Sequence, residues 1–260
     1  MATRFFNFTC TAGLSLNPTK TQLMVTGTKC SDIGEISICA CPITPTATLN
    51  LLGLKYDCNL TTAPYLHDLE IAAKARSGLI SRLSHQLPPY LLRGVAQGLV
   101  YGKVTYATAA AIIARTQEDD HVPNGLTEII RNIQVTLNDV TCTVAGVKRT
   151  DRKTLTDLRA ATGFPSLNSA AVRAAAMQAW TCINTRDHVA SLMLSKNEIA
   201  TGHAMPSRAT TAGCLRLPLR GQTQINTLTR LWNQCTDLRS ACTKSQAATA
   251  AIKIARSAPD

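Results

Sequence analysis

The sequence predicts an α+β fold that is predominantly helical, with a small antiparallel sheet preceding a series of helices. Short β-rich runs separated by turn residues fill the first quarter of the chain. Farther along, apolar residues recur every three or four positions, which is the period of an amphipathic helix. A chain of 260 residues with 45% apolar content can also bury a core. We therefore predict a sheet over 1–65, a basic helical hairpin over 66–116 and a helical region over 117–260, with an irregular segment at 185–222.

Within the first part, turn residues divide the chain into short elements. A brief helix is expected before Asn17 and Pro18, followed by an extended run at 21–26. Isoleucines flank a Cys/Pro turn within 36–43, and an apolar strand is expected over 48–56.

The hairpin is predicted from two helical stripes separated by a proline pair. Leu69, Ala73 and Ile80 mark the first helix, and Pro88-Pro89 ends it and starts the second, because proline suits only the first turn of a helix. The second helix should bury one stripe: Leu91, Val95, Leu99, Gly102, Tyr106, Ala109 and Ile113.

The last part is predicted to contain further helices with recognisable ends. The cleanest amphipathic period covers 126–144, and its apolar stripe could either close the chain's own core or dock a partner helix. A helix over 151–162 should stop at Gly163, and Asn168 or Ser169 should cap the next helix. A final helical pair is expected over 226–256.

Charge favours a polyanionic partner. Lysine and arginine number 27 against 16 acids, which gives a net charge of +11, so nucleic acid is the first candidate partner and an anionic membrane the second. No acid lies between Glu70 and Glu118, so the basic residues of this stretch form either a phosphate-binding surface or an ordinary solvated face. They are Lys74, Arg76, Arg82, Arg93, Lys103 and Arg115.

Cysteine usage and the N-terminus predict an intracellular protein, nuclear or cytoplasmic and not secreted. The ten cysteines include one close pair, Cys39 and Cys41, which does not provide the two clustered pairs of a zinc site. The N-terminal apolar run is interrupted by Asn7, and no stretch reaches the roughly 18 apolar residues of a membrane span. We therefore expect reduced thiols and no membrane partner.

Motifs for metal or cofactor chemistry are weak, and no cofactor is predicted. Glu118-Asp119-Asp120 could form a magnesium-dependent nuclease site, but adjacent acids in a polar linker are more typical of an exposed loop. The five histidines lack metal-ligand spacing. Trp180 and Trp232 lie among aliphatic residues at helical spacing, which favours a core role over base stacking.

An ordered series of short motifs resembles the reverse transcriptases of non-LTR (LINE-type) retrotransposons, downstream of their active site. The series is Leu14-Ser15-Leu16-Asn17-Pro18-Thr19-Lys20-Thr21-Gln22, Leu51-Leu52-Gly53-Leu54-Lys55-Tyr56-Asp57, Ala73-Lys74-Ala75-Arg76, Leu87-Pro88-Pro89-Tyr90 and Leu99-Val100-Tyr101-Gly102. The segment from Thr162-Gly163-Phe164-Pro165 to Trp180 resembles the helical tail of the same elements. The resemblance implies the end of a polymerase palm, a thumb and a C-terminal extension.

The resemblance also implies roles for particular residues. Lys20 would lie near the triphosphate of the incoming nucleotide, and Leu52 and Gly53 would form a primer grip, although Gly53 could equally mark a strand bulge. Five basic residues would contact phosphates of an RNA or RNA–DNA duplex: Lys74, Arg76, Arg82, Arg93 and Lys103.

The chain departs from this family in its catalytic carboxylates. The Ala-Asp-Asp motif, which binds magnesium in the complete enzyme, is absent from the sequence. The expected function is therefore that of a truncated copy that binds nucleic acid nonspecifically without polymerising alone. The missing polymerase portion is a candidate partner. The alternative is a non-enzymatic helical module that binds other proteins.

Overall fold

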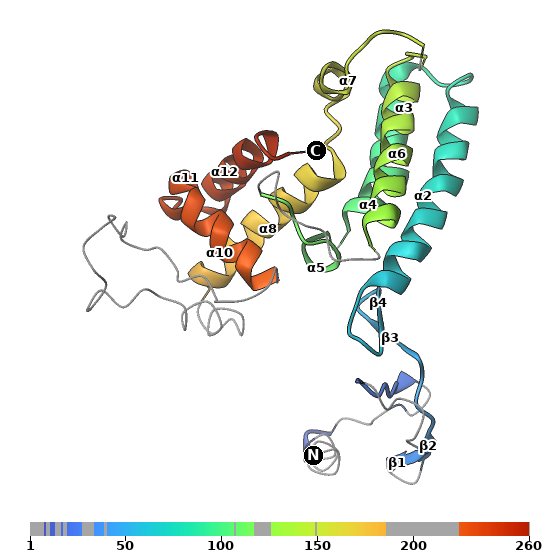
Figure 1. Ribbon diagram of the computed structural model, residues 1–260, viewed down its shortest axis with the longest axis vertical. Helices are drawn as coiled ribbons and strands as arrows, with labels where there is room; N and C mark the ends of the chain where they lie inside the picture. Colours follow the sequence, from blue (N-terminus) through green and yellow to red (C-terminus); the bar gives the residue numbers. More distant parts are fainter. Residues whose placement is uncertain are drawn as a thin grey trace. The chain divides into compact units, whose positions relative to one another are not determined.

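The computed structural model divides the chain into two compact units, Met1–Asp68 and Leu69–Asp260 (Figure 1). The predominantly helical α+β class predicted from the sequence is confirmed. The structure describes residues 8, 11–13, 17, 20–27, 34–38, 41–106, 108–116, 126–148, 150–185 and 224–259.

The first unit contains two antiparallel hairpins. Strands β1 (Ile36–Ile38) and β2 (Cys41–Ile43) pair around the predicted Cys/Pro turn, with Ile36 opposite Ile43. Strands β3 (Thr48–Leu51) and β4 (Leu54–Asp57) form the second pair. The sheet that the sequence predicts is thus split into two separate two-stranded sheets.

The single strand predicted over 48–56 is wrong, because the chain reverses at Leu52 and Gly53. Both residues have positive φ, 50° and 82°, which is the pattern of a two-residue type I′ turn. Glycine adopts this conformation without steric cost, whereas Leu52 places its side chain 84% exposed in solvent. Gly53 is therefore a turn residue and not a bulge.

The extended run predicted at 21–26 is not a strand but an extended segment held along the second hairpin. A single parallel bridge joins Leu23 to Pro45, and the Asn50 N–H donates to the Gln22 side chain at 2.8 Å. The Gly27 N–H also donates to the carbonyl of Cys58. Pro45 has no N–H with which to extend the pairing, which limits this contact to one bridge.

Asp57 organises the loop that follows β4. Its carboxylate accepts hydrogen bonds from the N–H groups of Asn59 and Thr61 and from the Thr61 hydroxyl, the last at 2.6 Å. Desolvation by burial opposes the ionised form, but the hydrogen bonds from Thr61 and Asn59 outweigh it and lower the pKa of Asp57. This stabilisation is present above the carboxyl's ordinary pKa and is lost as the pH falls through the lowered one.

The predicted helical hairpin is present. Its first arm is α2 (Ala63–Leu83), of which Leu69–Leu83 belongs to the second unit. Its second arm runs through α3 (Pro89–Ala96), a π-helical turn η2 (Gln97–Tyr101) and α4 (Gly102–Thr105), and starts after Pro88 as expected. The Arg76 guanidinium donates to the Leu99 carbonyl at 2.6 Å and joins the two arms.

The buried stripe of the second arm is displaced from the predicted one. Leu91, Leu99 and Tyr106 are exposed, and the buried residues are instead Leu92, Ala96, Val100, Tyr101 and Val104. Apolar residues occupy adjacent positions along this arm, so the pattern fits either stripe, and the π-turn adds a residue that changes the phase of the helix. The arm also ends at Tyr106, before a separate short helix α5 (Thr108–Ala111).

Tyr101 lies where the hairpin meets helix α6 (Thr127–Val144). Its ring stacks on Phe164 with 4.2 Å between centroids, and its hydroxyl lies 3.2 Å from the Leu137 carbonyl and 2.9 Å from the Thr141 hydroxyl. Tyr101 is 1% exposed, and this burial raises its pKa to about 12. The apolar stripe of α6 is buried too, so it closes the chain's own core: Ile133, Leu137, Val140 and Val144.

Two further helices begin at hydroxyl caps. Helix α7 (Leu155–Thr162) starts after Thr154, later than predicted because Asp151 instead closes a turn with Lys148. Helix α8 (Leu167–Asn184) is capped by Ser166, whose side chain accepts from the Ser169 N–H. The predicted capping by Asn168 or Ser169 is therefore wrong.

Asn168 serves instead as a cross-link. Its amide oxygen accepts from the Arg115 N–H at 2.8 Å, and its amide nitrogen donates to the carbonyls of Arg115 and Pro259. A single side chain therefore joins the end of the segment after α5 to the C-terminal residues.

The C-terminal helices pack against α8, and α8 and α12 bury many small side chains. They are α10 (Gln224–Gln234), α11 (Thr236–Arg239) and α12 (Lys244–Arg256), and Figure 1 shows α8 in yellow beside them. The predicted final pair thus contains a third, short helix. Buried alanines on α8 and α12 are Ala170, Ala171, Ala175, Ala176, Ala179, Ala247, Ala250, Ala251 and Ala255. The predicted irregular segment at 185–222 lies outside the described residues, except for Thr185.

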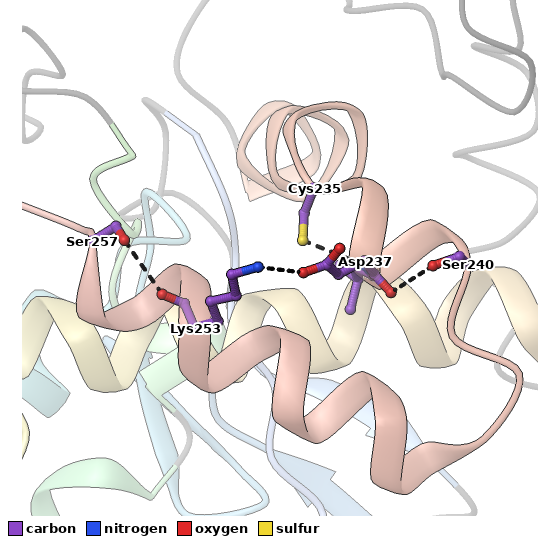
Figure 2. Close-up of polar contacts among 6 residues, drawn as sticks. Cys235, Asp237, Ser240, Lys253 and Ser257 are labelled. Carbon is purple, nitrogen blue, oxygen red and sulfur yellow. Dashed lines mark hydrogen bonds and ion pairs between the residues drawn. The ribbon is translucent and has the colours of Figure 1, made fainter.

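Polar contacts fix the corner between α10 and α12 (Figure 2). The Cys235 sulfur accepts from the Leu238 N–H and so acts as the cap of α11. Asp237 pairs with Lys253 of α12 at 2.8 Å, and this hydrogen bond raises the pKa of Lys253. Both partners are exposed, so this link between α11 and α12 contributes little to the free energy of folding.

Tyr101 predicts a specific weakness at alkaline pH. Above pH 10 the unfolded chain releases the phenol proton, whereas the folded chain keeps it up to about pH 12. The free energy of unfolding should therefore fall by up to about 1.4 kcal/mol per pH unit across this range. Denaturant titrations should show that Tyr101→Phe lacks this fall in the free energy of unfolding with pH. Tyr90→Phe, which changes an exposed ring, should retain it. Equal pH slopes for the two variants would contradict the assignment.

Candidate nucleic-acid interface

The residues predicted to bind a nucleotide and a primer all belong to the first unit. Lys20 is exposed, and its N–H donates to the Asn17 carbonyl at 3.2 Å. Two residues later, Gln22 holds this segment to β3, which leads into the turn at Leu52 and Gly53. The turn presents an exposed leucine and a glycine with no Cβ to the surroundings. No hydrogen bond or ion pair joins the Lys20 side chain to the turn among the described residues.

Two of the five predicted phosphate-binding cations already have intramolecular partners. The Lys74 amine pairs with the buried Glu70 at 2.6 Å, four residues earlier on the same helix. The Arg76 guanidinium is half-buried and donates to the Leu99 carbonyl. Their role in the hairpin is therefore structural as well as electrostatic.

Arg82 and Arg93 are the exposed pair at the closed end of the hairpin. The Arg76–Leu99 hydrogen bond fixes the register of the two arms, and moving six residues toward Pro88 on each arm places Arg82 level with Arg93. Both side chains are exposed, and neither forms an ion pair among the described residues. We call residues 82–93 the hairpin tip.

The cations of the second arm do not share one face. Arg93 follows the buried Leu92, and Lys103 precedes the buried Val104, so the two lie on opposite sides of the buried line. Lys103 is half-buried. The expected surface of five cations therefore reduces to the tip, with Lys103 on a separate side.

Arg93 extends over the end of α7. Helix α7 terminates at Gly163 with φ of 71°, and a Cβ added there would lie 2.7 Å from the Arg93 Nη2 atom. Carbonyl groups at a helix C-terminus carry partial negative charge, which favours a guanidinium nearby. Gly163 is thus favoured by its backbone conformation, and the flexible end of the Arg93 side chain lies against it.

A cleft of about 600 Å³ adjoins the hairpin tip. It lies between the start of α3, the end of α6 and helix α7. Its lining includes Tyr90, Arg93, Val144, Lys153, Asp157 and Leu158. Sequence reasoning missed Tyr90 and Lys153, although the basic run Lys148-Arg149-Thr150-Asp151-Arg152-Lys153 carries a signal for the second.

The described residues provide no metal site. No group of three histidine, cysteine or carboxylate side chains converges among them. The acidic run at 118–120 lies outside the described residues, so the structure does not test the nuclease hypothesis. Burial raises the pKa of the Cys182 thiol, which keeps it protonated and unreactive. Trp180 donates to the Ala241 carbonyl and Trp232 is buried, in agreement with a core role.

Comparisons with known proteins found no match to this chain. Neither a protein-family model, nor a curated protein, nor a solved structure matches it. In the part of the chain that the structure describes, no helix has the length and apolar character to span a membrane.

Backbone conformation predicts opposite effects for two glycine substitutions. Gly163→Ala should lower the free energy of unfolding by about 1–2 kcal/mol, because a positive φ is strained for alanine. Gly78→Ala on α2 meets no neighbouring atom and should raise the free energy of unfolding by about 0.5–1 kcal/mol. Urea titrations measure both, and a neutral Gly163→Ala variant would contradict this arrangement.

Proposed function

We propose that this chain binds RNA or an RNA–DNA duplex through phosphates, and that it corresponds to the C-terminal part of a non-LTR retrotransposon reverse transcriptase. The observation that carries the binding proposal is the hairpin tip, where Arg82 and Arg93 are exposed, level with each other and free of carboxylate partners among the described residues. No acid occurs between Glu70 and Glu118, so the surrounding chain does not neutralise them. Phosphate contacts by such side chains position a duplex without reading its sequence.

The ordered motif series supports the family proposal. The segment with Lys20, the turn at Leu52 and Gly53, and the helical hairpin follow one another as the palm end, primer grip and thumb do in that family. By this resemblance the exposed turn would approach a primer terminus and Lys20 a triphosphate. The chain carries no Ala-Asp-Asp motif, so we propose no polymerisation by this chain alone, and magnesium would act only in the complete enzyme.

We further propose an intracellular location, nuclear or cytoplasmic. Support comes from cysteines that form no disulfide among the described residues, since reducing compartments preserve thiols. They are Cys58, Cys142, Cys182, Cys235 and Cys242.

Salt-dependent binding tests the proposal. Fluorescence anisotropy with a labelled RNA–DNA duplex should show binding at 50 mM salt that weakens steeply at 200 mM, because phosphate contacts release counterions. Arg82→Gln should reduce the magnitude of the salt slope by about 1 and weaken binding alike across duplex sequences.

The matched control is Lys244→Gln, which removes an equally exposed charge from the start of α12. It should leave the salt slope within error of the parent chain. Absence of binding at 50 mM salt, or equal losses for Arg82→Gln and Lys244→Gln, would reject the hairpin tip as the interface.

A second candidate function is protein binding, and exposed apolar side chains on the hairpin favour it. Ile71, Leu79, Leu91 and Leu99 are large residues that remain exposed on α2 and the second arm. Such a surface suits contact with another polypeptide, including a polymerase portion supplied separately. This candidate places the partner on the hairpin and not on α6, whose stripe is buried.

Association measurements test the second candidate. Size-exclusion chromatography with light scattering should show self-association or added-partner binding that Leu91→Lys weakens, since a charge would be buried at the contact. Tyr106→Lys, also exposed but after the second arm, is the comparison variant. A monomer at micromolar concentration that binds no hydrophobic dye would exclude this candidate.

A further inference from the structure

The cleft beside the hairpin tip combines two cations with apolar walls. Its volume of about 600 Å³ falls within the range of sites for small molecules. Arg93 enters it from α3 and Lys153 from the loop before α7, while Val144, Val147 and Leu158 provide apolar surface. A ligand that fits this lining carries negative charge on one part and an apolar surface on another.

The single carboxylate of the cleft does not neutralise its cations. Asp157 lies in the first turn of α7, where its Oδ2 atom accepts the Thr154 hydroxyl at 2.6 Å. No ion pair joins Asp157 to Arg93 or Lys153 among the described residues. The end of the Arg93 side chain lies close to Gly163. Two cations against one carboxylate give the cleft a net positive charge that suits an anion.

Tyr90 adds a flat aromatic surface to the same cleft. Its side chain is 73% exposed although it belongs to the first turn of α3, so its ring is open to a ligand. Helix α3 begins at prolines without a side-chain cap, and Pro89 and Tyr90 of its first turn line the cleft. An aromatic ring beside two cations matches a base joined to a phosphate.

We propose that this cleft binds a nucleoside phosphate, with the phosphate on Arg93 and Lys153 and the base against Tyr90. The ligand is either a free nucleotide or the unpaired terminal nucleotide of a nucleic-acid strand. In the second form the inference rests on the proposed function, because the strand would lie on the adjacent hairpin tip. The cleft then holds the end of a strand while the tip contacts its phosphate backbone.

Calorimetric titration with adenosine 5′-monophosphate, adenosine and inorganic phosphate tests the cleft at 50 mM salt. The monophosphate should bind more tightly than either fragment. Lys153→Gln should weaken monophosphate binding about tenfold through a lost charge-assisted contact. Tyr90→Ala should weaken it about fivefold or more, and Tyr90→Phe should restore it because the ring is retained. Both substituted side chains are exposed, and circular dichroism checks that the variants remain folded.

A second set of binding measurements distinguishes the two ligand sources and separates this inference from the proposed function. A duplex with a one-nucleotide 5′-phosphorylated overhang should displace the monophosphate, whereas a blunt duplex should not. If the overhang duplex does not displace the monophosphate, the site is assigned to free nucleotides. Arg82→Gln should weaken duplex binding and leave monophosphate binding unchanged, so either proposal can fail without the other. No binding of the monophosphate, or equal binding by Lys153→Gln and the parent chain, would overturn the inference.

Discussion

The second unit depends on one buried polar side chain, that of Tyr101. Its ring stacks on Phe164 in the loop between α7 and α8, and its hydroxyl lies within hydrogen-bond distance of Leu137 and Thr141 of α6. A phenol excluded from water must find such partners, since an unsatisfied hydroxyl would cost the folded state about 1–3 kcal/mol. The register between the hairpin and α6, and the position of the α7–α8 loop, are therefore set together.

The basic surface follows from that packing. With the hairpin held on α6, the end of α6 and helix α7 lie beside the start of α3, where they form the cleft with Tyr90 and Arg93. Arg93 in turn lies over Gly163, whose neighbour Phe164 is the stacking partner of Tyr101. This surface arginine thus lies beside the loop that contributes Phe164 to the core aromatic pair.

The buried face of a helix could be predicted from the sequence where the apolar spacing was unambiguous. The prediction failed where the same residues fit two different buried faces. The stripe of α6 was predictable because polar residues separate its apolar positions, whereas the second arm has adjacent apolar residues and a π-turn that no periodicity reveals. The hairpin at Leu52 was missed because leucine rarely takes positive φ, so Gly53 alone did not indicate a two-residue turn.

The candidate site was predictable in its charge but not in its geometry. A run without acids identifies the cations but not their partners. Lys74 pairs with Glu70 because the two lie four residues apart on one helix, and Arg76 meets the Leu99 carbonyl only through tertiary packing. Lys153 joins the cleft through a loop sixty residues beyond Arg93, a distance along the chain that composition cannot bridge. Tyr90 carries no charge, so a run without acids does not indicate it, and its exposure depends on the folded structure.

The alanine-lined contact between α8 and α12 has a consequence for how this chain can vary. Methyl groups allow two helix backbones to approach closely, and dispersion forces across so short a gap replace the volume of larger side chains. A bulkier residue at a buried alanine of this contact would force the two helix backbones apart locally. Small residues should therefore be favoured there, so this interface should diverge more slowly than its bland composition suggests.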